Sequence, residues 1–501
     1  MTVASWPETM IGLIRRHRIF VALLVAAAVL RIVVAVTYHP LLMFYGDSFS
    51  YLTNAEHLAP AFYRPVLYSL FDWPFVHAHA IPLIPVAQHA MGLGIGVAVY
   101  AILYRLGAGQ WSSLGAAPVL FDGFQLNVEQ FALAETLFTA FVVVAVGLVV
   151  WRKRPGIVVS MLAGAALAGA ALTRSVGLVL IVPLVIYLVA RRARVIAVVA
   201  AVCVFAVGLI AYASWYQADR GHLALTGADG YFLYGRVATF ADCTRLPALP
   251  KEEWVLCDPR PPAKRPSANT YIWGSRSQLD LLSVHGKVAR NKVLEDFAFR
   301  VIEHQPLDYV RTIGGDVLHY FSPFRHTGRQ DEPIEIWRFP LRVPVLRRVY
   351  GRVPPRFGVA QPLPSVRRYG SGAHFLRSYQ SVVNSGPIMA LALALGVIGL
   401  FVAAPGARRL RAECFLLVSS GLGILVVPAA TAMFDFRYMV PTLVLIPPAG
   451  VLGGVAAARR IAGWRARRAE SSGSGLVTPD ASPAGDDPVE SASAREEHLA
   501  R

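Results

Sequence analysis

Long apolar runs alternate with short polar segments along most of the chain. The first run, residues 19–37, is apolar at nearly every position, and similar runs recur as far as residue 458. A run of about 20 apolar residues is long enough to cross the hydrocarbon core of a bilayer as a helix. The pattern therefore predicts an all-α polytopic membrane protein with about ten transmembrane helices. These spans are expected at 19–37, 81–104, 112–127, 130–150, 157–173, 176–190, 195–215, 387–404, 414–432 and 439–458.

Basic residues gather on one side of this expected bundle. They precede the first span and follow the even-numbered spans, and enrichment in Lys and Arg marks the cytoplasmic side of a membrane. We therefore expect a multi-pass protein of the inner (plasma) membrane with both termini in the cytoplasm. The clusters comprise Arg15, Arg16, Arg18, Arg105, Arg152, Lys153, Arg154, Arg191, Arg192, Arg194, Arg408, Arg409, Arg411, Arg459, Arg460, Arg465, Arg467 and Arg468.

The strongly basic composition has the same origin. The chain contains 48 Lys and Arg residues against 31 Asp and Glu residues, which gives a net charge of +17. The cytoplasmic clusters account for this excess, so we expect membrane lipids as partners of the basic residues and no nucleic acid.

The expected topology divides the chain into four parts. Residues 1–215 form an N-terminal transmembrane module whose first outer loop is 38–80. Residues 216–385, between the seventh and eighth spans, are too many for an unstructured connection, and we expect a mostly helical extracytoplasmic domain. Residues 386–460 form the C-terminal transmembrane helices, and the Ser-, Ala-, Pro- and Asp-rich residues 461–501 form a disordered cytoplasmic tail.

Within the outer domain, apolar residues recur at helical spacing from Ser283 to Phe321. The proline-rich segments 259–266 and 354–364 predict irregular structure. Cys243 and Cys257 lie 14 positions apart in the same domain, where an oxidising compartment permits a disulfide. No Cys/His quartet suited to a metal surrounds the pair, so we expect a disulfide.

Charged residues also lie at the outer ends of the expected spans. Such groups are costly near the membrane and mark functional sites. Asp47, in the segment GDSFSYL, follows the first span, and Arg64 precedes the second. The others are Asp122, Glu129, Glu135, Arg174, Asp435 and Arg437.

One reaction suits a carboxylate that faces an anionic lipid headgroup. Transfer of a sugar from a polyprenyl-phosphate requires a base that takes a proton from the acceptor hydroxyl, and cations that stabilise the departing phosphate. Asp47 is the candidate base. Arg437, Arg64 and Arg174 are the candidate phosphate ligands, because guanidinium groups match phosphate oxygens in a bidentate manner.

Five segments resemble those of the GT-C superfamily of polyprenyl-phosphate-dependent membrane glycosyltransferases, which includes protein O-mannosyltransferases, aminoarabinose transferases and actinobacterial arabinofuranosyl- and mannosyltransferases. Asp47 in GDSFSYL matches the acidic residue of the family's first outer loop, and Tyr51 follows at the usual spacing. The other segments are RPVLY (64–68), LAETLFTAF with Glu135, ALTRSVGLVLIVP (171–183) and FDFRYMVPTLVLIPP with Arg437. The match covers roughly residues 20–215 and 385–450.

The resemblance implies an inverting transfer of one sugar at the outer face, with Asp47 as general base. Donor and acceptor would be a polyprenyl-phosphate-sugar and a cell-envelope glycan, lipid or secreted protein. Several family members have an Asp-Glu pair in the first loop, whereas Ser48 follows Asp47 here. Asp122, Glu129 and Glu135 compete for the second acidic position, and Glu135 and Glu129 join Asp47 as catalytic candidates. No cofactor or metal is expected, although a divalent ion between Asp47 and Glu129 is the alternative.

Two other functions compete with this interpretation. A polytopic transporter or lipid flippase would have paired halves and charges near the bilayer midplane, and the sequence has no evident repeat. An acyl- or phosphotransferase would require a nucleophile or a histidine-centred site, for which His77 and His79 are the only nearby candidates.

Overall fold

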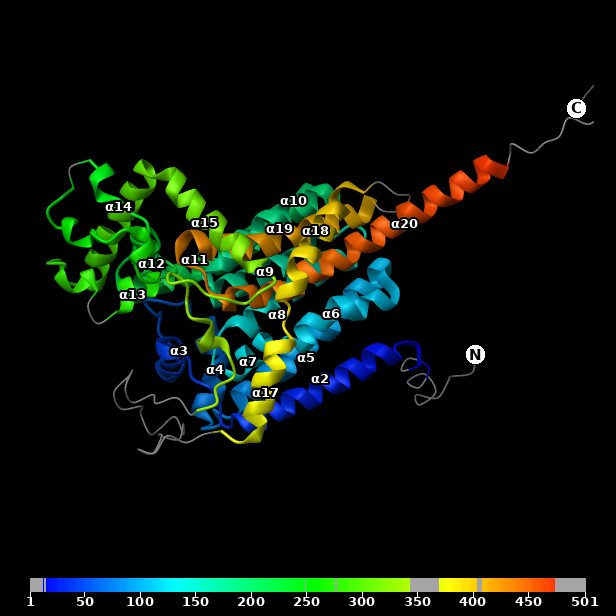
Figure 1. The fold of residues 1–501 in the computed structure, drawn as a ribbon, viewed down its shortest axis with the longest axis horizontal. Helices are drawn as coiled ribbons and strands as arrows, with labels where there is room; N and C mark the ends of the chain where they lie inside the picture. The colour runs from blue at the N-terminus through cyan, green and yellow to red at the C-terminus, as the bar shows by residue number, and fades with distance from the viewer. Residues whose placement is uncertain are drawn as a thin grey trace, which may run out of the picture.

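The chain folds into a helical bundle with a smaller helical domain at one end (Figure 1). The computed structural model describes residue 12 and residues 15–247, 249–274, 277–342, 369–402 and 408–473. Within these ranges the regular elements are helices, and an isolated bridge joins Leu42 to Phe131. The fold is therefore all-helical, as the sequence predicts.

Five helical segments are long and apolar enough to cross a membrane, or six if a pair bent by 44° counts as one span. The five lie in α2 (Arg18–Thr37), the kinked pair α5 (Leu83–Leu103) and α6 (Ser112–Phe121), α11 (Val195–Arg220), the pair α17 (Ser371–Val382) and α18 (Gly386–Phe401), and α19 (Arg408–Thr431). The bent pair is η10 (Phe436–Val444) with α20 (Ile446–Gly473). Several long apolar helices thus indicate a multi-pass membrane protein.

Shorter apolar helices complete the bundle. They are α8 (Glu135–Trp151), α9 (Ile157–Thr173) and the pair η3 (Ser175–Leu180) and α10 (Ile181–Ala190). The buried faces of these helices pack with α5, α19 and α20 in one apolar core, which includes Phe138, Leu188 and Leu452. Helix α9 has the predicted bounds.

The junction between the third and fourth expected spans differs from the prediction. The third ends at Phe121, and Asp122, in an extended conformation, begins a separate helix α7 (Gly123–Gln130) by accepting bonds from Phe124 N and Gln125 N. A side-chain cap of this kind satisfies backbone N–H groups that a helix start leaves without partners. Helix α8 then begins at Glu135, so Glu135 lies in its first turn and not one or two turns inside a span.

The start of α2 and the end of α20, which both carry basic residues, lie at the same end of the bundle (Figure 1). Helix α2 begins and α20 ends at the right of Figure 1, opposite the smaller domain. At that end Arg459 donates to the carbonyl oxygen of Gly107 at 2.7 Å. Disorder from residue 461 onward was the wrong expectation for 461–473, which continue α20. Residues 474–501 and 354–364 lie outside the described part of the chain.

The smaller domain consists of α12 (Asp229–Ala238), α13 (Ala268–Trp273), α14 (Lys287–His304) and α15 (Pro306–Tyr320). The predicted helical stretch 283–321 is two helices, broken where Gln305 precedes Pro306. A residue before proline is disfavoured in the helical region, which explains the break. Tyr234, Leu294 and Phe297 are fully buried in the core of this domain.

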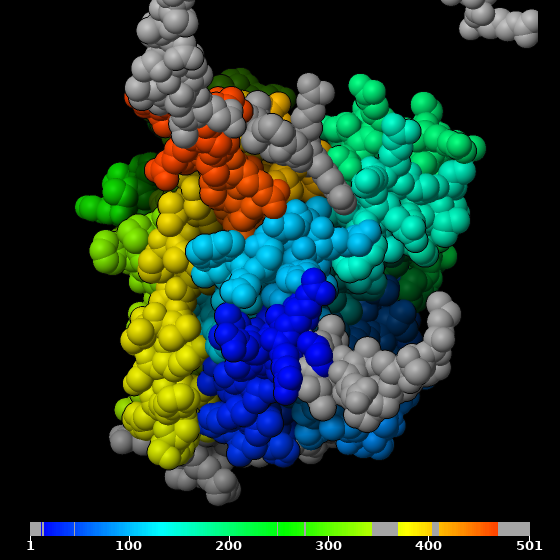
Figure 2. Space-filling model, turned by 90° about the vertical axis from the view of Figure 1, so that its right-hand side faces the viewer, coloured from blue at the N-terminus to red at the C-terminus, as the bar shows by residue number. Residues whose placement is uncertain are grey.

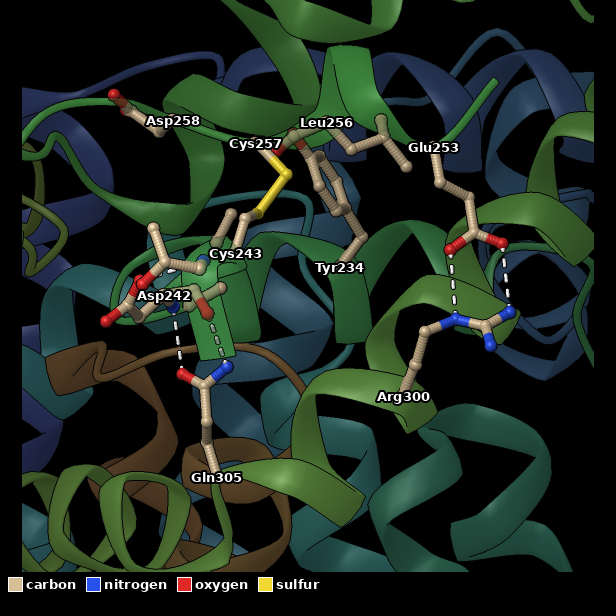
Figure 3. The surroundings of a disulfide bond; sticks show 12 residues. Tyr234, Asp242, Cys243, Glu253, Leu256, Cys257, Asp258, Arg300 and Gln305 are labelled. Atoms are coloured by element: carbon tan, nitrogen blue, oxygen red, sulfur yellow. Dashed lines mark hydrogen bonds and ion pairs between the residues drawn. A yellow bond between two sulfur atoms is a disulfide. The ribbon is translucent and has the colours of Figure 1, made fainter. Parts of the chain in front are cut away.

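A disulfide between Cys243 and Cys257 closes a loop of this domain, which confirms the predicted pairing (Figure 3). The loop is also held at both sides by α14 and its C-cap. The amide of Gln305 exchanges two hydrogen bonds with the backbone of Asp242, and Glu253 accepts two from Arg300. The disulfide therefore belongs to an anchored loop.

Candidate active site

A cavity of about 600 Å³ opens between the bundle and the smaller domain. Six of the seven side chains that the sequence singles out for chemistry line it: Asp47, Tyr51, Arg64, Glu135, Arg174 and Arg437. They come from the segment between α2 and α5, from α8, from the α9–η3 break and from η10. Residues that are far apart in the sequence thus share one cavity.

The first outer loop carries Asp47 in the first turn of α3 (Tyr45–His57) and continues through α4 (Leu67–His77). Ser48 anchors this turn, because its hydroxyl accepts from Phe44 N at 2.9 Å and donates to Ala132 O at 2.9 Å. Leu42 pairs through its backbone with Gln130 and Ala132. Ser48, which occupies the position of a second acid in the resembling family, therefore binds the Asp47 loop to the α7–α8 turn.

Two arginines hold the Asp47 carboxylate. Arg64 Nη2 donates to Oδ1 at 3.0 Å and to Oδ2 at 3.2 Å, and Arg437 Nη1 donates to Oδ2 at 2.9 Å. Burial alone would raise the pKa of Asp47, but the charges of Arg64 and Arg437 and their hydrogen bonds outweigh it and hold that pKa below its usual range. Asp47 is therefore ionised at neutral pH.

Arg437 lies at the centre of the site. Its Nη1 is 3.9 Å from Glu135 Oε1, and its Nε is 3.1 Å from Asp435 Oδ2. Asp435 also caps η10, because its carboxylate accepts from the backbone N–H of Arg437 at 3.0 Å. The guanidinium packs over the ring of Phe44 at 4.9 Å. Contacts on several sides fix its position.

Glu135 supplies another carboxylate of the cavity, next to Arg437. It forms an ion pair with Arg174, which lies in an extended segment between α9 and η3 and packs over the ring of Tyr438. Charges thus alternate along a line from Arg64 through Asp47, Arg437 and Glu135 to Arg174. The three guanidinium groups therefore lie in one line, and Asp229 and Glu295 add two further carboxylates to the lining of the cavity.

The walls of the cavity differ in character. An apolar wall comes from η3 and α19, with Val176, Leu178, Val179, Val427 and Pro428. Another part of the lining comes from Tyr63, in the loop between α3 and α4, and from the smaller domain and its approach, with Thr226, Asp229, Phe232, Glu295 and Phe299. The line of alternating charges from Arg64 to Arg174, called the arginine line below, lies in the same cavity as these residues.

Tyr51 faces the cavity from α3 and is almost fully buried. Its ring lies edge-on to that of Tyr68 with 4.7 Å between centroids. Burial raises the pKa of Tyr51, so its hydroxyl stays protonated.

Glu129, the seventh residue, does not line the cavity. It is fully buried, accepts from Arg31 at 2.8 Å and 2.9 Å, and lies 2.8 Å from His89 Nδ1. Gln125 donates to the same carboxylate at 2.8 Å. Glu129 and Asp47 thus belong to separate ion clusters. Asp122, the other competitor, caps α7 and accepts from Ser385 N at 2.6 Å, so Glu135 is the carboxylate that accompanies Asp47.

Sequence reasoning missed Arg31 and His89, the partners of Glu129. An arginine in the middle of the apolar run 19–37 was the available signal, since a charge there requires a buried partner. It also missed Asp229 and Glu295, for which the sequence offers no pattern. Among the described residues, no group of three His, Cys, Asp or Glu is suited to hold a metal ion. His77 and His79 are exposed and do not line the cavity.

No protein-family model, curated protein or solved structure matches the chain. The functional argument therefore depends on the residues of the cavity and on their geometry.

Proposed function

We propose that the protein is a membrane glycosyltransferase that moves a sugar from a polyprenyl-phosphate donor to a cell-envelope or secreted acceptor, a glycan, lipid or protein, at the outer face. One observation carries the proposal: Asp47 lies between Arg64 and Arg437 in a cavity that also has an apolar wall. A base, phosphate ligands and a surface for a lipid tail are the parts that this reaction requires.

The donor phosphate binds the arginine line in this proposal, and the polyprenyl tail lies along η3 and α19. When Arg64 and Arg437 turn from Asp47 towards the phosphate, their positive charges move away from the carboxylate. The pKa of Asp47 then rises, because these charges are what holds it low. Donor binding therefore makes Asp47 a stronger base. Glu135 holds Arg174 and Arg437 in place, and Tyr51 supports the helix that carries Asp47.

In the chemical step, the acceptor oxygen attacks the anomeric carbon with inversion while its proton passes to Asp47. The bond between the anomeric carbon and the phosphate oxygen breaks, and its electron pair stays on the lipid phosphate. The added negative charge is stabilised by Arg437, Arg64 and Arg174. Protein side chains supply each of these functions, so we expect no obligatory metal or cofactor.

The proposal includes the topology. The ten predicted spans would contain the apolar segments α2, α5, α6, α8, α9, the η3–α10 pair, α11, α18, α19 and the η10–α20 pair, of which α6, with ten residues, rises only about 15 Å. Both termini would be cytoplasmic, because the basic clusters flank the end opposite the smaller domain. The smaller domain and the cavity would then face the outside.

The test is a transfer assay with purified protein, a panel of polyprenyl-monophosphate sugars and the Asp47→Asn variant. Asn keeps the size of the side chain but takes no proton, so we expect transfer to fall by about 10²- to 10⁴-fold. Asp219→Asn, at an exposed acid of α11, is the matched control and should leave the rate unchanged. Full transfer by Asp47→Asn would overturn the mechanism.

The buried Arg31–Glu129–His89 cluster favours a second candidate, a transporter or lipid flippase, because intramembrane charges often mark transport pathways. Proteoliposomes loaded with a polyprenyl-phosphate-sugar separate the two functions. Movement of the lipid between leaflets with no product would support the flippase, whereas glycosylated acceptor would support the transferase.

A further inference from the structure

A second cavity lies at the basic end of the bundle and shares no residue with the first. It is a groove of about 510 Å³ between α6, α18 and α20. Its surface is almost wholly apolar, with Leu114, Leu391 and Val451 among its lining residues. Figure 2 looks at this end and shows the orange-red α20 next to the light-blue α6 region and the yellow segment that includes α18.

The groove has the length of one membrane leaflet. Its lining on α20 runs from Pro447 to Arg459, which lie twelve positions and about 18 Å apart at the rise of an α-helix. One leaflet contributes about half of the roughly 30 Å hydrocarbon core. A Cβ at Gly454 would meet only Leu395 Cδ1, at 4.0 Å, so the groove is open beside this residue and a single hydrocarbon chain fits along the helices. Gly450, in contrast, packs directly on Ala392 of α18.

The basic end of the groove has the features of a headgroup site. The guanidinium of Arg459 donates to Gly107 O at 2.7 Å, and among the described residues it has no carboxylate partner. Trp111, which is 65% exposed, lies at the same end of the groove. Tryptophan is enriched at the level of the lipid headgroups, and arginine near the membrane surface attracts anionic lipids.

We propose that this groove binds one anionic phospholipid, with an acyl chain between α6, α18 and α20 and its phosphate on Arg459. The positive charge selects the headgroup, and the apolar groove retains the chain. The site holds a resident lipid of the leaflet at the basic end and is independent of the reaction in the first cavity.

Native mass spectrometry of the full-length protein in detergent tests the proposal, with dioleoyl-phosphatidylglycerol and dioleoyl-phosphatidylcholine as probes. We expect the wild type to retain one phosphatidylglycerol about fivefold more tightly than phosphatidylcholine, the factor that one surface arginine supplies. Arg459→Gln should abolish this preference. Arg460→Gln, which alters a neighbouring arginine outside the groove, should keep it.

A second variant fills the groove. A side chain at Gly454 meets only Leu395 Cδ1, at 4.0 Å, so Gly454→Leu enters the groove without displacing the backbone. This variant should lose the retained lipid, whereas Gly463→Leu, on the same helix outside the groove, should keep it. Wild-type retention by Gly454→Leu, or equal binding of both lipids by the wild type, would overturn the proposal. A dimer that Gly454→Leu dissociates would also overturn it, because the groove would then hold a second copy.

Discussion

Arg437 Nη1 donates to Asp47 Oδ2 at 2.9 Å, although 390 positions separate the two residues in the chain. The same guanidinium nitrogen lies 3.9 Å from Glu135. Arg437 therefore connects Asp47 with Glu135, and its position determines whether the line of alternating charges is complete.

Substitution of Arg437 should impair transfer more than substitution of any surface arginine. Arg437→Gln removes a charge that stabilises the departing phosphate, and we expect kcat to fall by about 10²- to 10³-fold. Arg437→Lys keeps the charge but loses the planar group that reaches Asp47 and Asp435 together, so it should restore only part of the rate. Steady-state kinetics with the donor lipid measure both, with Arg460→Gln as the control. Wild-type kcat in Arg437→Gln would exclude a role in catalysis.

The pH dependence of kcat/KM should respond to Arg64. Because Arg64 and Arg437 hold the pKa of Asp47 below its usual range, the acidic limb due to Asp47 should lie below about pH 4 in the wild type. Arg64→Gln removes one of the opposing charges, so the pKa rises and the limb moves to higher pH. The stability that the Asp47 carboxylate contributes is present above about pH 4 and is lost as the pH falls through its folded-state pKa. A limb that does not move in Arg64→Gln would contradict this assignment.

The buried cluster around Glu129 should be sensitive to a single methyl group on α5. A Cβ at Gly92 would overlap Oε1 of Glu129 and approach Arg31 Nη2 to 3.0 Å, whereas a Cβ at Gly94 has no neighbour within 4 Å. Gly92→Ala should therefore strain the ion pair and lower the stability by about 3 kcal/mol or more, within the range for disruption of a buried ion pair. Thermal unfolding in detergent measures the effect. Gly94→Ala, the control two positions away, should be neutral, and equal unfolding of both variants would contradict the prediction.

Removal of the disulfide should destabilise the smaller domain. The bond closes a loop of 14 positions, and the chain-entropy model gives about 3 kcal/mol for a loop of roughly that length. Paired Cys243→Ser and Cys257→Ser substitutions should thus lower the free energy of unfolding by about that amount and increase proteolysis near Asp242. Cys203→Ser, at an exposed free cysteine in α11, is the control. Unchanged proteolysis in the double variant would show that Gln305 and Arg300 alone anchor the loop.

The sequence predicts the helical class, the outer domain and six residues of the cavity because these depend on local properties. Apolar runs mark helices, and the alternation of basic loops assigns a side to Asp47, Arg174 and Arg437 alike. Which carboxylate meets which arginine depends on packing between helices. Glu129 and Glu135 are six positions apart, yet the extended segment between α7 and α8 directs one to Arg31 and the other to Arg174.

The junction at Asp122 illustrates the same limit. Apolar residues continue among polar ones as far as Val128, so the pattern predicts a longer third span and places Glu135 inside the fourth. The structure ends α6 at Phe121 because the Asp122 carboxylate caps α7 and also binds Ser385 N, a contact across 263 positions. The local pattern of apolar and polar residues cannot indicate a contact with a residue so far away in the sequence.

The contact between Asp47 and Arg437 also sets an order of assembly during synthesis. Arg64 lies 17 positions after Asp47, so in the proposed topology this pair is available as soon as the loop that carries both residues has crossed the membrane. Arg437 emerges only when the last apolar segment is made. A ribosome-bound chain halted before residue 437 would therefore have the proposed base, Asp47, but would lack Arg437, and the proposed site would become complete only after that residue is made.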